Sequence, residues 1–323
     1  MGLAIKGKKV IGLALNGKKI LGEAKNGKVI WRSSFITHTP WKFPADNGVK
    51  SVAVDPSGNV YAGNYGASVY KLDASGKQVW KFTADNLVNS VAVDSSGNVY
   101  VGTGNNSVCK LNTSGNQVWK FTADGFVMSV AVDSSGNVYA GTFGHSVYKL
   151  DASGNQVWKF TADGVVNSVA VDSSGNVYAG TYDDADGDDD DEYVYKLDAS
   201  GHQVWQFTAD SNVNSVAVDS SGNVYVGTGN NSVCKLNTSG NQVWKFTADS
   251  NVNSVAVDSN GNVYAGTNNC SVYKLDASGH QVWQFTADSN VNSVAVDSSG
   301  NVYVGTDNSS VYKLTPDGSN TAY

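Results

Sequence analysis

The chain has 323 residues, of which 16% are charged and 35 are glycine, and its formal net charge is −7. Residues 1–40 contain eight Lys/Arg and only Glu23 as an acid, whereas the remainder contains 14 Lys/Arg and 28 Asp/Glu. An acidic body repels phosphate backbones, so this balance excludes nucleic acid as its partner. No apolar run reaches the roughly 18 residues of a membrane span, so we expect no membrane insertion.

Residues 2–31 repeat with a period of ten, as GLAIKGKKVI, GLALNGKKIL and GEAKNGKVIW. Lys6-Gly7, Asn16-Gly17 and Asn26-Gly27 occupy two-residue hairpin positions, which predicts a small β-meander. Lysines and asparagines interrupt every apolar run, so we expect no signal peptide. Thirty residues bury too little surface for independent stability. We therefore predict an attachment module at 1–34, followed by a second domain at 35–323, with an oligomer or virion partner held through residues 1–40.

A longer repeat follows, marked by tryptophans that each precede Lys/Gln-Phe. Their spacing is 39 residues, with one interval of 47. Residues 90–124 and 215–249 are identical, which indicates recent internal duplication. The tryptophans are Trp41, Trp80, Trp119, Trp158, Trp205, Trp244 and Trp283.

Each unit contains four runs of strand length that are rich in Val, Tyr and Thr. In the unit that begins at Trp80 the runs are Val88–Asp94, Asn98–Thr103, Ser107–Leu111 and Gln117–Phe121. Glycine-containing turns join the runs, which predicts a four-stranded antiparallel meander. A period near 40 with four strands predicts an all-β fold, a seven-bladed β-propeller. A solenoid is the alternative, but it needs distinct capping units, and the last unit resembles the middle ones.

The last unit lacks the strand that contains Trp in the other units. We expect Phe35–Phe43, at the other end of the repeat, to supply the outer strand of the last blade. That pairing removes an open sheet edge. The alternative is that Ser319–Tyr323 forms this strand.

The spacing of Asp73, Gly76 and Trp80 resembles the docking motif of the pyrroloquinoline-quinone (PQQ)-like propeller repeat. The motif recurs as Asp151, Gly154 and Trp158 and as Asp198, Gly201 and Trp205. Asn112 and Asn237 replace the Asp in two further copies. The resemblance implies that each Trp wedges between neighbouring blades.

Catalytic members of the PQQ-like family are quinone-dependent alcohol dehydrogenases with a vicinal cysteine pair and a dedicated Asp base. The cysteines of this chain, Cys109, Cys234 and Cys270, are not adjacent. We therefore expect a non-enzymatic binding scaffold without PQQ, and we interpret Cys109 and Cys234 as small apolar strand residues. A quinoprotein-like dehydrogenase remains an alternative. So does a purely structural propeller produced by repeat amplification.

The segment Lys25–Trp31 is similar to N-terminal segments of tail and baseplate proteins in phages of Gram-positive bacteria. This resemblance implies a virion location and a host-recognition role, with a glycan or surface protein as ligand.

The units differ mainly in the connections between blades and in the turns between second and third strands, which share one face of a propeller. Neutral drift is one explanation, but drift should affect both faces alike. Aromatic side chains in these loops suit stacking on sugars or on a protein. We predict ligand-binding roles for Tyr65, Phe126, Phe143, His145 and Tyr182.

The fourth unit has an eight-residue insertion within Asp183–Glu192, where eight of ten residues are acidic. Alternating carboxylates around a glycine suit calcium. The predicted ligands are Asp184, Asp186, Asp188 and Asp190, and a solvated acidic loop is the alternative.

A recurring Asp precedes each first strand, at Asp46 and its equivalents in the other units. We expect these carboxylates to form hydrogen bonds within turns rather than an ion site.

Overall fold

The computed structural model describes residues 13–15, 18–25, 28–32, 40–183 and 192–320. The chain divides into two compact units, Met1–His38 and Thr39–Tyr323. Every described element is a β-strand. Among these residues no helix is long and apolar enough to cross a membrane.

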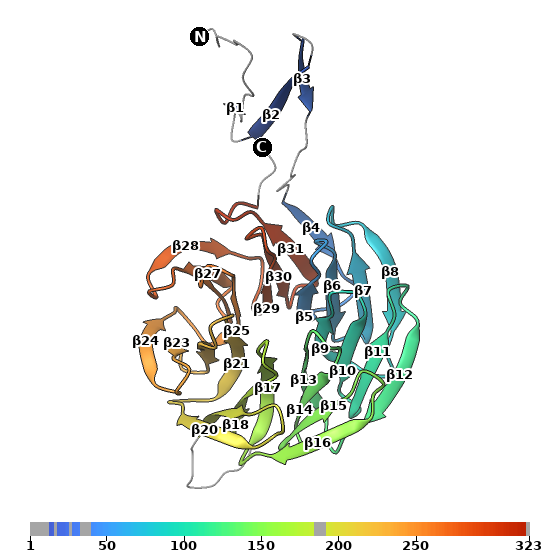
Figure 1. The fold of residues 1–323 in the computed structure, drawn as a ribbon, viewed down its shortest axis with the longest axis vertical. Helices are drawn as coiled ribbons and strands as arrows, with labels where there is room; N and C mark the ends of the chain where they lie inside the picture. Colours follow the sequence, from blue (N-terminus) through green and yellow to red (C-terminus); the bar gives the residue numbers. More distant parts are fainter. Residues whose placement is uncertain (1–12, 16–17, 26–27, 33–39, 184–191, 321–323) are drawn as a thin grey trace. The chain divides into compact units, whose positions relative to one another are not determined.

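The first unit contains a three-stranded antiparallel sheet in the order β1-β2-β3 (Figure 1). The strands are β1 (Leu13–Leu15), β2 (Lys18–Lys25) and β3 (Lys28–Arg32). The predicted small meander is confirmed. The proposed hairpin turns lie outside the described residues.

The second unit is a ring of seven four-stranded antiparallel sheets, which confirms the predicted propeller (Figure 1). Blades 1 and 2 are β5 (Val49–Val54), β6 (Val60–Asn64), β7 (Ser68–Leu72), β8 (Gln78–Thr83) and β9 (Val88–Val93), β10 (Val99–Thr103), β11 (Ser107–Leu111), β12 (Gln117–Thr122). Blades 3 and 4 are β13 (Val127–Val132), β14 (Val138–Thr142), β15 (Ser146–Leu150), β16 (Gln156–Thr161) and β17 (Val165–Val171), β18 (Val177–Tyr182), β19 (Tyr193–Leu197), β20 (Gln203–Thr208). Blades 5 and 6 are β21 (Val213–Val218), β22 (Val224–Thr228), β23 (Ser232–Leu236), β24 (Gln242–Thr247) and β25 (Val252–Val257), β26 (Val263–Thr267), β27 (Ser271–Leu275), β28 (Gln281–Thr286). Blade 7 is β29 (Val291–Val296), β30 (Val302–Thr306), β31 (Ser310–Leu314) and β4 (Trp41–Pro44).

Blade 7 closes the ring with chain from both ends of the repeat. β4 pairs with β31, with Trp41 opposite Lys313 and Pro44 opposite Ser310. The predicted closing strand is confirmed for Trp41–Phe43. Pro40 is not part of the strand, and the remaining residues of that prediction lie outside the described residues. The alternative is wrong, because β4 occupies the outer edge of β31. The Ser319 carbonyl accepts a turn hydrogen bond from the Thr315 amide at 3.0 Å.

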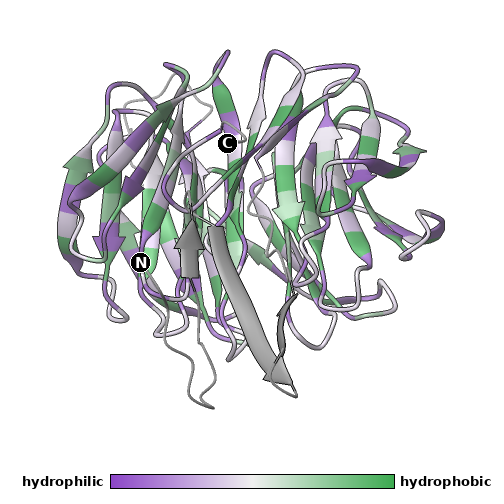
Figure 2. Ribbon diagram, turned by 90° about the horizontal axis from the view of Figure 1, so that it is seen from above, coloured by the Kyte–Doolittle hydropathy of each residue, from purple (hydrophilic) through white to green (hydrophobic). Residues whose placement is uncertain are grey.

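The hydrophobic core lies between blades, where buried residues of neighbouring sheets pack together. Hydrophobic and hydrophilic residues alternate along the strands (Figure 2). Tyr61 of β6 is fully buried among residues of blade 2, and its hydroxyl donates to Asp55 at 3.0 Å. Because this arrangement recurs in every blade, the deepest aromatic side chain of each interface is a tyrosine rather than the tryptophan.

The tryptophans nevertheless dock as the PQQ-like resemblance implies. Trp80 is half-buried, and the centroids of its ring and the Tyr61 ring lie 6.1 Å apart. Its Nε1 donates a hydrogen bond to the Thr113 carbonyl of the next blade at 3.0 Å. Gly115 lies beneath the indole, with φ of 83°. A Cβ there would stand 2.9 Å from Trp80 Cδ2, so the motif needs glycine for both conformation and space.

Candidate functional site: a pocket on the variable face

Antiparallel strand order places the connections between blades and the turns between second and third strands at one end of every blade. We call this end the variable face. In six blades the residue after the second strand pairs with the residue before the first through a backbone hydrogen bond of 2.8–3.1 Å. In blade 4 the equivalent residues belong to the strands and pair in their register. The pairs are Gly48/Tyr65, Leu87/Gly104, Phe126/Phe143, Val165/Tyr182, Asn212/Gly229, Asn251/Asn268 and Asn290/Asp307.

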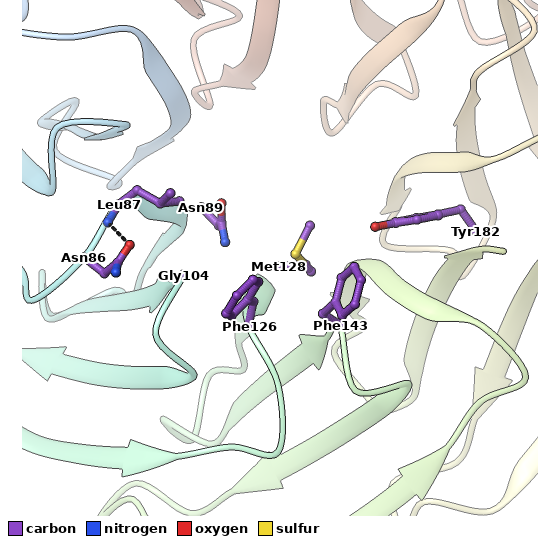
Figure 3. A pocket seen from close by; sticks show the side chains of 8 residues that line it. All are labelled: Asn86, Leu87, Asn89, Gly104, Phe126, Met128, Phe143 and Tyr182. Atoms are coloured by element: carbon purple, nitrogen blue, oxygen red, sulfur yellow. Dashed lines mark hydrogen bonds between the residues drawn. The ribbon is translucent and has the colours of Figure 1, made fainter. Parts of the chain in front are cut away.

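A pocket of about 410 Å³ opens on this face across blades 2, 3 and 4 (Figure 3). The rings of Phe126 and Phe143 stand side by side, with centroids 6.0 Å apart and planes tilted by 45°. They are 51% and 40% exposed, which is unusual for phenylalanine in a folded protein. The lining is Asn86, Leu87, Asn89, Gly104, Phe126, Met128, Phe143 and Tyr182.

Three residues predicted to bind ligand therefore lie together: Phe126, Phe143 and Tyr182. Tyr65 and His145 lie on the same face outside the pocket lining. Tyr65 is 41% exposed, and Lys50 Nζ lies 5.4 Å from its ring centroid.

Sequence reasoning missed Met128 and Leu87. Met128 belongs to the position that carries Asn in five blades, as at Asn89, whose side chain donates to the Val127 carbonyl of the next blade at 3.0 Å. The Met128 thioether cannot donate that hydrogen bond. In blade 3 an apolar side chain therefore replaces the hydrogen bond between blades. The sequence itself shows this departure, because Met128 is the one apolar residue at a position that otherwise has Asn or, in blade 1, Lys50.

The aspartates that precede each first strand, such as Asp46, form hydrogen bonds and ion pairs with residues of other strands. This finding corrects the expectation of hydrogen bonds within turns. Asp46 accepts hydrogen bonds from Asn64 and Ser68 and forms an ion pair with Lys81 of the outer strand at 2.5 Å. Burial would raise the pKa of Asp46, but hydrogen bonds from Lys81, Tyr70 and Asn64 lower it to about 2.

Equivalent lysine–aspartate pairs recur in blades 2, 3, 5 and 7. Blades 4 and 6 have Gln206 and Gln284 at the lysine position. Asp163 of blade 4 accepts a hydrogen bond from the Tyr195 hydroxyl at 2.7 Å, and it makes no ion pair with any residue that the structure describes.

The predicted calcium ligands, Asp184, Asp186, Asp188 and Asp190, lie outside the described residues. Within the described part of the chain, no group of three or more His, Cys, Asp or Glu side chains could hold a metal ion. Calcium binding by the insertion stays a prediction.

Two of the cysteines are core residues. Cys109 and Cys234 are buried, and burial raises the pKa of each thiol to about 11. Their interpretation as small apolar strand residues is confirmed.

The family model described as outer membrane protein assembly factor BamB matches residues 20–125, 112–188 and 190–321. A comparison with curated proteins finds no match. The matched segments together run through all seven blades. The chain therefore belongs to the PQQ-like β-propeller repeat family whose model is described as outer membrane protein assembly factor BamB.

Proposed function

We propose that this propeller is a non-enzymatic binding scaffold that recognises a glycan or a surface protein through the pocket of the variable face. The observation that carries the proposal is the gathering of Phe126, Phe143 and Tyr182 around one opening. Exposed aromatic rings beside polar groups are typical of recognition surfaces. The family description speaks of outer membrane protein assembly, which supports a protein as one class of partner.

The second part of the proposal concerns attachment. Residues 1–40 hold eight of the 22 basic residues, and we propose that they join the propeller to sister chains or to a larger particle such as a phage or prophage tail. The repeated hairpin pattern of residues 2–31, too small to be stable alone, supports this part. The mass of the full chain in solution tests it: an oligomer that becomes monomeric on removal of residues 1–38 supports attachment between copies.

Binding to arrays of glycans and of surface proteins tests recognition. We expect the full chain to bind members of one array, and a Phe126→Asn, Phe143→Asn, Tyr182→Asn variant to lose that binding. Val118→Asn is the control, since it removes an exposed apolar side chain from the outer strand of blade 2, outside the pocket. A wild-type chain that binds neither array, or a triple variant that binds as well as wild type, contradicts the proposal.

The dehydrogenase alternative has a separate test. The three cysteines are far apart in the sequence, which disfavours the vicinal pair of catalytic relatives. We expect the chain supplied with PQQ, calcium and an alcohol to reduce no dye acceptor. Turnover above that of the free quinone contradicts the non-enzymatic part of the proposal.

A further inference from the structure

The variable face has an apolar side and a polar side. Connection residues in blades 2 to 4 are Leu87, Phe126 and Val165, whereas blades 5 to 7 all have Asn there. After the second strand, blades 3 and 4 have aromatic residues, whereas blades 5 to 7 have Gly, Asn and Asp. The backbone pairing is the same on both sides, so the fold does not require the apolar residues.

The pocket has apolar lining residues besides the aromatic rings. Met128 lines it where most blades have a bridging Asn, and Leu87 lines the blade 2 side. Unbranched Met adapts its shape to an inserted apolar group. The two phenylalanine rings are tilted by 45°, so they form the walls of a socket rather than one flat platform for a sugar ring.

Two carboxamides complete the rim. The Asn86 side-chain oxygen accepts the Leu87 amide at 2.8 Å, so its amino group remains as a donor. Asn89 uses its amino group on the Val127 carbonyl, so its oxygen remains as an acceptor. A donor and an acceptor beside an apolar socket suit the C=O and N–H of a polypeptide backbone.

Charge distinguishes the blade 4 side of the pocket. Asp85 and Asp124, before the connection residues of blades 2 and 3, are neutralised by lysines at 2.5 and 2.8 Å. Asp163 is exposed, and blade 4 has Gln206 where those blades have the lysine. It precedes by two residues Val165, which pairs with the pocket residue Tyr182. A cationic side chain of a ligand is therefore favoured on this side.

We propose that the pocket binds an extended segment of another polypeptide, with a bulky apolar side chain in the socket and a Lys or Arg next to it at Asp163. The inference rests on the proposed function and names its ligand class. The apolar anchor supplies the affinity, and the cation supplies the specificity.

Calorimetric titration of the full chain tests this ligand class. The probes are acetyl-Gly-Lys-Leu-Phe-Lys-Gly-amide, the same peptide with Glu for both Lys, the same peptide with Ser for Leu and Phe, and tri-N-acetylglucosamine. We expect the first peptide to bind, the acidic peptide to bind at least tenfold more weakly, and the serine peptide to give no heat.

Two pairs of variants locate the binding. Phe126→Asn with Phe143→Asn should abolish it, and Val118→Asn should leave it unchanged. Gln206→Lys supplies the lysine that other blades have. This lysine should neutralise Asp163, so the affinity for the basic peptide should fall severalfold. Gln284→Lys makes the same change in blade 6 and should have no effect. Melting temperatures of all variants within a few degrees of wild type establish that each is folded.

Binding of the sugar without any peptide overturns the inference and leaves the proposed scaffold function intact. The absence of binding heat with all four probes overturns the inference as well. Binding to the glycan or protein arrays then decides whether the proposed function survives. Equal binding of the basic and acidic peptides overturns the role of Asp163.

Discussion

The backbone amide of Phe143 donates to the carbonyl of Phe126 at 2.8 Å, and the two rings lie 6.0 Å apart. The same backbone link joins Asn268 to Asn251 in blade 6 at 3.0 Å. One backbone geometry thus supports either two phenylalanines or two asparagines. The backbone atoms of these residues therefore maintain the fold, whereas their side chains decide whether the variable face is apolar or polar.

We predict that Phe126→Asn with Phe143→Asn changes the free energy of unfolding by less than about 1 kcal/mol, because exposed side chains contribute little to stability. Urea denaturation measures the change. Val127→Asn is the contrasting variant, since Val127 is fully buried and an unpaired amide there should cost about 2 kcal/mol or more. Loss of more than about 2 kcal/mol in the double phenylalanine variant would show that the rings are structural.

The docking of the tryptophans was predictable because Gly and Trp recur at fixed spacing after Asp or Asn in six of the seven copies. The burial of Tyr61 was not recognised, although its partner Asp55 precedes it by six residues and the pair recurs in every unit. The pocket was only partly predictable. Phe126 and Tyr182 are 56 residues apart in different blades, and only the ring geometry brings them to one opening.

A second prediction concerns the close approach of neighbouring blades. A Cβ at Gly102 would stand 2.6 Å from Val127 Cγ1 of the next blade. Gly102→Ala should therefore destabilise the propeller by about 1–3 kcal/mol through overpacking. Adding Val127→Ala removes the clashing methyl, so the double variant should lose less stability than the sum of the single variants. Strict additivity in urea denaturation would exclude this contact as the cause.

A third prediction concerns the turns between second and third strands, where non-glycine residues adopt positive φ. Cys270 has φ of 59°, and the equivalent positions in blades 2 and 5 are Asn106 and Asn231. Asparagine tolerates this conformation better than most residues. Cys270→Asn should therefore raise the melting temperature, by an amount that corresponds to about 0.5–1 kcal/mol.

Cys109→Asn is the control for that change, because it places an amide in the buried strand position and should lower the melting temperature. A lower melting temperature for Cys270→Asn would contradict the conformational argument.

A fourth prediction follows from the closure of blade 7. Removal of residues 1–38 keeps β4, so the propeller should remain folded and monodisperse. Removal of residues 1–44 deletes β4 and exposes the edge of β31, which should promote aggregation and lower the melting temperature. Light scattering measures the aggregation of the two truncated chains, and thermal unfolding measures their melting temperatures. Equal behaviour of both truncated chains would mean that β4 is dispensable for closure.

The last prediction concerns acid. The pKa of Asp46 in the folded chain is about 2, below its ordinary value of 3.8. A lowered pKa stabilises the folded state above pH 4, and this stabilisation is lost as the pH falls through 2. The same direction holds for Asp94 and Asp133, where burial opposes the shift but hydrogen bonds from Asn98 and Asn137 lower the pKa. The melting temperature should therefore fall steeply below pH 4.

Lys81→Gln isolates the ion pair in this acid response, because blades 4 and 6 have Gln at that position. Without the lysine, the pKa of Asp46 should move back toward its ordinary value. The variant should melt at a lower temperature than wild type at pH 7, and the difference should shrink as the pH falls from 4 to 2. Thermal unfolding followed by circular dichroism measures both curves. A difference that is constant with pH would mean that Lys81 stabilises the blade through packing rather than through charge.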